Sequence, residues 1–163
     1  MSDLPIHQPI HEFTTRRRIE FADTDMAGIV HFARFFVFME TAEHELLRHV
    51  GMEVHSTVDG MRIGWPRKAT RCEYLRPVRF ADEVVIHVSV LRKGRTSLTF
   101  EHVFEHDGEV IARGRMTSVC CQLDAPGGLR AVPIPALIDE RLMAKKPSPR
   151  SEGDRAGRGV TGG

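Results

Sequence analysis

The chain has few of the sequence features of secreted proteins, of proteins stabilised by a metal ion, or of membrane proteins. Its 163 residues include three cysteines: Cys72, Cys120 and Cys121. An odd number with two neighbours makes a poor disulfide framework and lacks the spacing of a zinc site, so we expect reduced thiols in a cytoplasmic protein and no metal. No run approaches the ~18 apolar residues of a membrane span, and Met1–Glu12 lacks the charged-then-apolar pattern of a secretory signal.

Charge is nearly balanced as well, with 23 Lys and Arg against 22 Asp and Glu and a formal net charge of +1. Such a balance gives no general reason to expect nucleic acid or an anionic membrane as a partner. The composition therefore predicts neither of these partners. We also expect no cofactor.

The length suits a single domain. A domain of this size buries on the order of 70% of the surface that its unfolded chain exposes, so it needs no disulfide or bound metal for stability. We place this domain at residues 14–144, after an N-terminal extension at 1–13. Residues 145–163 are mostly Gly, Pro, Ser and Arg, with almost nothing to bury, which predicts a disordered basic tail. A solvated terminus fits this tail better than a nucleic-acid arm, because no aromatic residue is interleaved to stack on bases.

The hydrophobic pattern predicts one long helix and a series of strands. Apolar residues recur at helical spacing from Phe35 to Val50, which predicts a helix that begins at His31 or Phe32 and ends near Val50. Period-two alternation and turn signals predict strands over 14–21, 69–75, 83–91, 97–105 and 109–123, with a short helix over 136–143. A helix followed by consecutive antiparallel strands must bury its apolar stripe against the sheet, which predicts an α+β fold.

The segment between the first strand and the helix carries the candidate chemistry. It contains Asp23 and Asp25, then Gly28, then His31 and Phe32 at the predicted helix start. The first amides of a helix lack intrahelical acceptors and carry the positive end of its dipole, and glycine lets a ligand approach them closely. A carboxylate beside free N–H groups supplies what hydrolysis of an activated acyl group needs: a group that drives attack and donors for the developing oxyanion.

Several segments together are similar to a known enzyme family. They are Phe21–Phe32 (FADTDMAGIVHF), Tyr74–Pro77, Phe80–Glu83 and Arg95–Ser97. On these residues the chain resembles the hotdog-fold acyl-CoA thioesterases of the 4-hydroxybenzoyl-CoA thioesterase type, over roughly residues 14 to 142. The resemblance implies a hotdog fold, in which a five-stranded antiparallel sheet wraps a long central helix. It also implies a homodimer or homotetramer with a continuous sheet and active sites at the subunit interface.

The resemblance further implies an activity and the residues that perform it. The substrate would be an acyl-CoA, hydrolysed to a carboxylic acid and free coenzyme A. Asp25 matches the family's catalytic carboxylate, and the backbone N–H of Phe32 matches its oxyanion donor. Whether Asp25 activates water or attacks the carbonyl itself stays open here. Two carboxylates facing one pocket would raise the pKa of one of them, so we expect Asp23 to point elsewhere, into structural hydrogen bonds.

Other candidate residues have both a functional and a structural interpretation. His31 is either a general base or substrate contact, or a histidine packed at the subunit interface. Arg92, Lys93 and Arg95 crowd one hairpin turn, where they either bind the phosphates of coenzyme A or form a solvated tip. Ser97 follows this turn and could hydrogen-bond near the pocket.

Two carboxylates on the helix lead to the rival functions. Glu40 and Glu43 lie on the predicted helix flank, where they are either catalytic or engaged in surface pairs. A hotdog hydratase or dehydratase acting on acyl-CoA pairs a histidine with a carboxylate, and His31 with either glutamate could imitate that pair. A non-catalytic acyl-CoA-binding module would hold the same ligand without releasing thiol. Gly64, Trp65 and Pro66 form either a pocket wall or only a turn.

Overall fold

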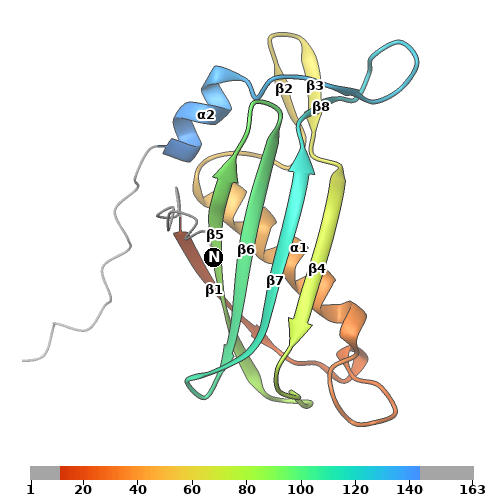
Figure 1. The fold of residues 1–163 in the computed structure, drawn as a ribbon, viewed down its shortest axis with the longest axis vertical. Helices are drawn as coiled ribbons and strands as arrows, with labels where there is room; N and C mark the ends of the chain where they lie inside the picture. Colours follow the sequence, from red (N-terminus) through yellow and green to blue (C-terminus); the bar gives the residue numbers. More distant parts are fainter. Residues whose placement is uncertain (1–11, 144–163) are drawn as a thin grey trace, which may run out of the picture.

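One long helix lies against a five-stranded antiparallel sheet in the computed structural model of the protein, which describes residues 12–143 (Figure 1). The predicted tail at 145–163 and nearly all of the predicted extension at 1–13 therefore lie outside the described residues. In chain order the elements are β1 (Glu12–Arg18), η1 (Phe21–Asp23), α1 (Phe32–His49), β2 (Ser56–Val58), β3 (Met61–Gly64), β4 (Arg67–Tyr74), β5 (Glu83–Lys93), β6 (Ser97–His106), β7 (Glu109–Val119), β8 (Cys121–Gln122), β9 (Arg130–Ala131) and α2 (Ala136–Met143).

The large sheet has the strand order β1-β5-β6-β7-β4, and every neighbouring pair is antiparallel. Alternation along each strand decides which side chains face the helix, so that Val84, Ile86, Val88 and Val90 of β5 are all buried. Strand β4 lies at one edge, and no described strand pairs with its outer side. The expected fold of a helix wrapped by five antiparallel strands is confirmed.

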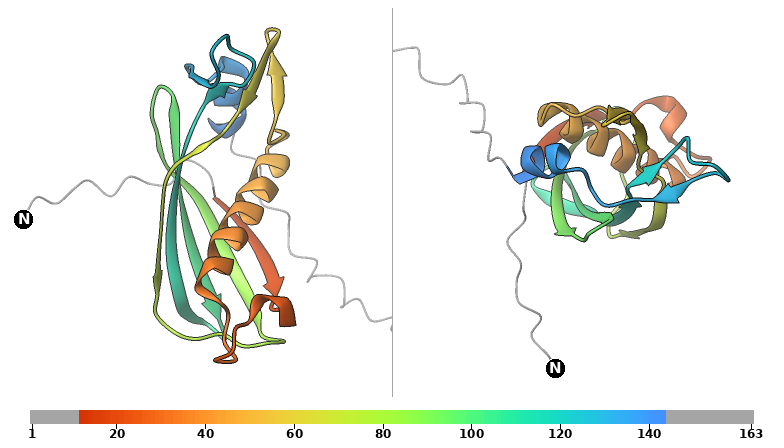
Figure 2. Two further views of the ribbon diagram at one scale, coloured as in Figure 1. Left: turned by 90° about the vertical axis from the view of Figure 1, so that its right-hand side faces the viewer. Right: turned by 90° about the horizontal axis from the view of Figure 1, so that it is seen from above.

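Helix α1 crosses the concave face of this sheet, as Figure 2 shows. The face predicted from helical spacing is the buried one: Phe35, Met39, Ala42 and Leu46 each expose 5% or less of their surface. After the helix, Gly51 has a φ of 77°, the left-handed conformation that glycine adopts without strain. Helix bounds and packing face thus follow the sequence pattern.

Two strand ends differ from the prediction by three residues or more, and the other boundaries differ by two residues at most. The first strand ends at Arg18 rather than at 21, because the next residues form η1, in which the Asp23 carboxylate accepts the Glu20 N–H (2.9 Å). The last long strand ends at Val119 rather than at 123, because the Cys120 N–H donates to a loop carbonyl, that of Thr96 (2.7 Å).

A second, four-stranded sheet (β2-β3-β8-β9) was not predicted, because its strands are only two to four residues long and show no alternation. It sits at one end of the molecule with α2 and the β5–β6 hairpin, whereas the η1–α1 loop lies at the opposite end (Figure 1). Strand β4 runs from the first end, at Arg67, to the second, at Tyr74.

Candidate active site

The loop between η1 and α1 is a short antiparallel ladder. Its main-chain pairs are Asp23–His31 (N···O 2.9 Å), Thr24–Val30 and Asp25–Ile29 (N···O 2.9 Å). The Val30 N–H also donates to the Val78 carbonyl (2.8 Å), which ties the loop to the neighbouring segment. The ladder therefore holds Asp25 and the start of α1 in one hydrogen-bonded unit.

Asp23 is the buried member of the aspartate pair, with 4% of its surface exposed. Besides the bond to Glu20, its Oδ1 accepts from Arg34 Nε (2.7 Å) and forms an ion pair with Arg34 Nη2 (2.6 Å). The carboxylate is fully engaged inside the protein, as expected from the sequence.

Asp25 is exposed at the far end of the ladder. Its Oδ1 accepts the Ala27 N–H (2.8 Å), an arrangement that aspartate commonly makes in turns. Gly28 closes the turn by donating to the Asp25 carbonyl (3.0 Å), and its φ of 74° suits glycine. No group within residues 12–143 binds the second carboxylate oxygen, which leaves it open to a ligand.

Helix α1 begins at Phe32, and His31 is its N-cap. His31 Nδ1 accepts the Ala33 N–H (3.2 Å), so the neutral ring carries its proton on Nε2 and offers a donor there. The lone pair that a hydratase would need as a base is already engaged in the cap. No group in the described part of the chain accepts the Phe32 N–H. Phe32 is the first residue of α1, and the first N–H groups of a helix have no intrahelical acceptor.

Tyr74, at the end of edge strand β4, contacts the first helical residue from the other side. Its hydroxyl donates to the Phe32 carbonyl (3.1 Å), and its ring packs edge-on against Phe35 with centroids 5.2 Å apart. Burial raises the pKa of Tyr74 to about 12, so the hydroxyl keeps its proton and remains a donor near neutral pH. Tyr74 thereby connects the edge strand to the helix start, a link that the sequence did not reveal.

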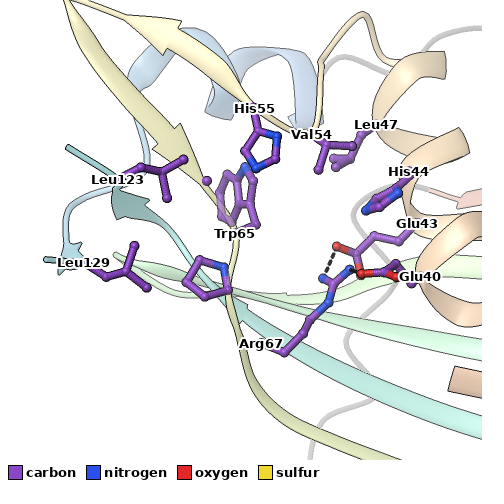
Figure 3. Close-up of a pocket in the computed structure, with 12 residues that line it drawn as sticks. Glu40, Glu43, His44, Leu47, Val54, His55, Trp65, Arg67, Leu123 and Leu129 are labelled. Atoms are coloured by element: carbon purple, nitrogen blue, oxygen red, sulfur yellow. Dashed lines mark hydrogen bonds and ion pairs between the residues drawn. The ribbon is translucent and has the colours of Figure 1, made fainter. Parts of the chain in front are cut away.

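A cavity of about 340 Å³ lies nearer the other end of the molecule, beside the second half of α1 (Figure 3). Its volume is in the range of small-molecule sites. Trp65 and Pro66 are part of its wall, which settles the choice between a wall and a turn. The apolar side chains that line it are Leu47, Val54, Trp65, Pro66, Leu123 and Leu129.

Glu43 is the buried carboxylate of this cavity, with 1% of its surface exposed. Its Oε1 pairs with Arg67 Nη1, which also donates to Ser118 Oγ (2.5 Å), whereas Oε2 has no hydrogen-bond partner. Burial raises the pKa of Glu43 to about 7, and the Arg67 charge opposes that rise. Arg67 Nη2 also lies 3.7 Å from Glu40, whose side chain is half exposed at the rim.

The buried position of Glu43 corrects the interpretation of this residue as half of a surface pair. The available signal was its spacing, because Glu43 follows Met39 by four positions and so continues the apolar stripe. Its partner Arg67 lies on β4, and nothing in the sequence pattern connects the two. Figure 3 shows both glutamates extending from α1 toward this arginine.

Within one chain, the ladder and the cavity are apart. Phe32 and Glu43 lie on the same helix, so their backbones are separated by roughly 16 Å at the α-helical rise per residue. The described residues thus carry a carboxylate with a free N–H donor in one place and a partly open cavity with apolar walls in another.

Comparison with known proteins identifies the family. A family model described as the thioesterase-like superfamily matches residues 19–142. The chain belongs to this superfamily. It is 30% identical over 135 residues to a 1,4-dihydroxy-2-naphthoyl-CoA hydrolase of Synechococcus sp. (strain WH7803), covering 78% of this chain and 86% of that protein. It is 26% identical over 104 residues to the acyl-CoA thioester hydrolase YbgC of Escherichia coli O157:H7, covering 63% and 77%.

Solved structures agree with this assignment. A gentisyl-coenzyme A thioesterase is 31% identical, with a TM-score of 0.69 over 78% of this chain and 99% of that one. The 4-hydroxybenzoyl-CoA thioesterase of Pseudomonas sp. strain CBS-3 shares the fold, with a TM-score of 0.70 at 21% identity over 80% and 98%. The expectations of a hotdog fold and of a thioester hydrolase are therefore confirmed. Within residues 12–143, neither helix is long and apolar enough to cross a membrane.

The basic hairpin of this thioesterase-like protein lies at the cavity end (Figure 1). Arg92 and Arg95 are exposed, while Lys93 is ion-paired with Asp139 of α2. Ser97 closes the turn through its carbonyl, which accepts the Gly94 N–H (2.8 Å). Two of the three predicted cations are thus free to meet a ligand, whereas Lys93 would first have to leave α2.

Proposed function

We propose that this thioesterase-like protein hydrolyses an acyl-CoA with the Asp25 carboxylate driving the attack and the Phe32 N–H receiving the oxyanion. The observation that carries this proposal is the ladder, because it joins these two groups in one hydrogen-bonded loop. One oxygen of Asp25 and the N–H of Phe32 both lack partners within the described residues. Donors fixed in place before reaction stabilise developing negative charge without reorganisation.

The chemistry needs one carboxylate and little else. Either Asp25 removes a proton from water as the water oxygen bonds to the acyl carbon, or Asp25 itself bonds to that carbon and water later hydrolyses the anhydride. In both routes the carbonyl electron pair moves to oxygen, beside the Phe32 N–H. The C–S bond then breaks, and the electron pair leaves with sulfur as coenzyme A thiolate. Because a thiolate is a weak base, no acid is needed to protonate it first.

We propose further that two copies of the chain pair through β4 to complete each site. The outer side of β4 carries unpaired main-chain groups, which a second strand would satisfy. In a twofold antiparallel pairing the Tyr74 end of one β4 meets the Arg67 end of the other. Phe32, held by Tyr74, would then approach the cavity that Arg67 borders in the second copy. A homodimer, alone or within a homotetramer, follows from this pairing.

The acyl group that we propose for the cavity is a compact ring bearing a hydroxyl. Apolar walls suit the ring, and Glu43 Oε2 is a buried acceptor that lacks a donor. Relatives named for gentisyl-CoA and 1,4-dihydroxy-2-naphthoyl-CoA support a hydroxylated aromatic acyl group. Replacing a ring hydroxyl by hydrogen in the acyl group should then reduce kcat/KM.

Exposed Arg92 and Arg95 are the groups we propose for the phosphates of coenzyme A, with Gly28 giving the thioester close access to the loop. All three cysteines are free thiols, which supports a reducing, cytoplasmic location.

Thiol release from a panel of acyl-CoAs, followed with a thiol-reactive dye, tests the proposal. Asp25→Asn should lower kcat by on the order of 10²–10⁴, the usual share of a positioned acid or base. Asp59→Asn is the matched control, since Asp59 is an exposed turn aspartate in the distant β2–β3 hairpin and should leave kcat unchanged.

Three outcomes would overturn the proposal. Near-full turnover by the Asp25→Asn variant would remove the carboxylate from the mechanism. Tight acyl-CoA binding with no thiol released over hours would favour a binding module. Hydration of an enoyl-CoA without thiol release would favour a hydratase.

A further inference from the structure

The first aspartate of the pair holds the helix start more tightly than a simple cap requires. Asp23 contacts it twice: its carboxylate binds the Arg34 side chain, and its carbonyl accepts the His31 N–H (2.9 Å). Arg34 in turn donates its own backbone N–H to the His31 carbonyl (2.9 Å). His31 is therefore held at both its N–H and its C=O by two residues that are themselves joined by an ion pair.

This arrangement fixes one particular peptide plane. The carbonyl of His31 and the N–H of Phe32 belong to the same planar amide, so the direction of one sets the direction of the other. Because Arg34 fixes the carbonyl from inside the helix, the Phe32 N–H must point the opposite way, out of the first turn. The direction of the Phe32 N–H thus depends on the geometry of the Asp23–Arg34 ion pair.

The Asp23–Arg34 ion pair also limits the charge repulsion between Asp23 and Asp25, which lie two positions apart. The Asp23 charge is matched by the Arg34 guanidinium, whose Nε donates to Asp23 Oδ1 and whose Nη2 forms an ion pair with the same oxygen. The same guanidinium lies over the Phe38 ring, 5.8 Å from its centroid, which limits its movement. Asp25 is the carboxylate of the ladder that has no cationic partner within residues 12–143.

We propose that Asp23 and Arg34 are positioning residues for hydrolysis: their ion pair aims the Phe32 N–H at the thioester oxygen. This rests on the proposed function, because it presumes that this N–H is the oxyanion donor. Neither residue touches the substrate. A misaimed donor weakens binding of the oxyanion more than binding of the ground-state carbonyl, so its loss reduces kcat and leaves KM nearly unchanged.

The test compares Asp23→Asn, Arg34→Lys and Arg34→Ala with wild type in the thiol-release assay. We expect kcat to fall by about 10- to 100-fold, less than the loss expected for deleting an oxyanion donor, with KM within about twofold. Arg34 is partly exposed, so added ethylguanidinium should enter the space left by Arg34→Ala and restore part of kcat. Glu83→Gln is the control, because it breaks a comparable but exposed ion pair, that with Arg16 (2.5 Å) between β1 and β5, and leaves the contacts of Asp23 and His31 in place.

A spectroscopic measurement separates aiming from mere stability. The carbonyl stretch of a bound ketone analogue of the thioester should move to lower frequency in wild type and less so in Asp23→Asn, if the donor is misaimed. Full kcat with a lowered melting temperature in all three variants would overturn the positioning role. If Asp23→Asn does not fold, Arg34→Ala with and without ethylguanidinium decides the question.

Failure of this inference can be distinguished from failure of the proposed function. If Asp25→Asn loses activity while the Asp23 and Arg34 variants keep it, the carboxylate mechanism stands and the positioning role is wrong. If Asp25→Asn is itself fully active, the mechanism fails and the positioning role fails with it.

Discussion

The two ends of helix α1 are built in opposite ways. At its start, the candidate groups are main-chain amides and an exposed carboxylate, held by a ladder and by Tyr74. Along its second half, the cavity is lined by side chains, and its carboxylate, Glu43, is buried against Arg67. Within the described residues, the helix start offers a free main-chain donor and a carboxylate but does not line the cavity, whereas the second half of the helix borders the cavity and offers no helix-start donor.

In the proposed dimer, this difference divides the work of a single site between the two ends. Main-chain donors at a helix start are kept under every side-chain substitution except one to proline, which suits a task that every substrate shares. A cavity made of side chains can change with the substrate while the reacting groups stay the same. We therefore expect changes at the start of α1 to affect kcat for all acyl groups, and changes beside the cavity to affect selectivity or stability.

The largest effect should come from removing the donor itself. Phe32→Pro deletes the N–H at the first helical position, where proline is well tolerated, and the extended backbone of His31 (φ −62°, ψ 133°) suits a residue before proline. We expect kcat to fall by about 10²–10³ for every acyl-CoA tested, with the helix retained by circular dichroism.

The control for this variant is Phe32→Ala, which keeps the N–H and removes the same exposed ring. Its kcat should stay within about threefold of wild type, since the ring adds little to the barrier. Equal losses in the two variants would mean that the ring, and not the amide, is what matters at the first end.

A smaller effect is expected at the second end, in the pH dependence of stability. The pKa of Glu43 is raised from 4.5 to about 7 by burial, so the folded state binds this proton more tightly than the unfolded state. The stabilisation that this tighter proton binding gives the folded state is fully present below pH 4.5 and is lost as the pH rises through about 7. Relative to Glu43→Gln, wild type should therefore lose on the order of 1–3 kcal/mol of unfolding free energy across this interval.

Denaturant unfolding of wild type and Glu43→Gln at several pH values measures this difference. Parallel profiles would show that Glu43 keeps an ordinary pKa and that Arg67 fully compensates its charge. Glu40→Gln is the matched control, because Glu40 is half exposed on the same helix and should leave the profile unchanged.

The smallest effect should come from Tyr74, which contacts the helix start without facing the reacting carbonyl. Tyr74→Phe removes one hydrogen bond to the Phe32 carbonyl and keeps the ring against Phe35. We expect a loss of about 1 kcal/mol in unfolding free energy and a decrease of a few-fold in kcat. A loss as large as that of Phe32→Pro would contradict the assignment of the N–H as the main donor.

The sequence was informative where a pattern repeats or a motif is local. The helix, its buried face and the five strands of the large sheet follow from spacing and turn signals. The structural hydrogen bonds of Asp23 were predicted because two carboxylates facing one pocket would repel each other. By contrast, the Glu43–Arg67 pair joins residues far apart in the chain, and the small sheet has strands too short to alternate. Such features depend on tertiary contacts that no local pattern encodes.

Mixing two defective variants tests most directly whether the two ends form one site across two copies. Asp25→Asn lacks the carboxylate, and Val54→Trp fills the cavity from its half-buried wall. If each site takes its carboxylate from one copy and its cavity from the other, equal amounts re-paired at random should recover about a quarter of wild-type activity. Recovery near that level is the predicted result, whereas a mixture as inactive as its parents would show that each chain must supply both parts itself.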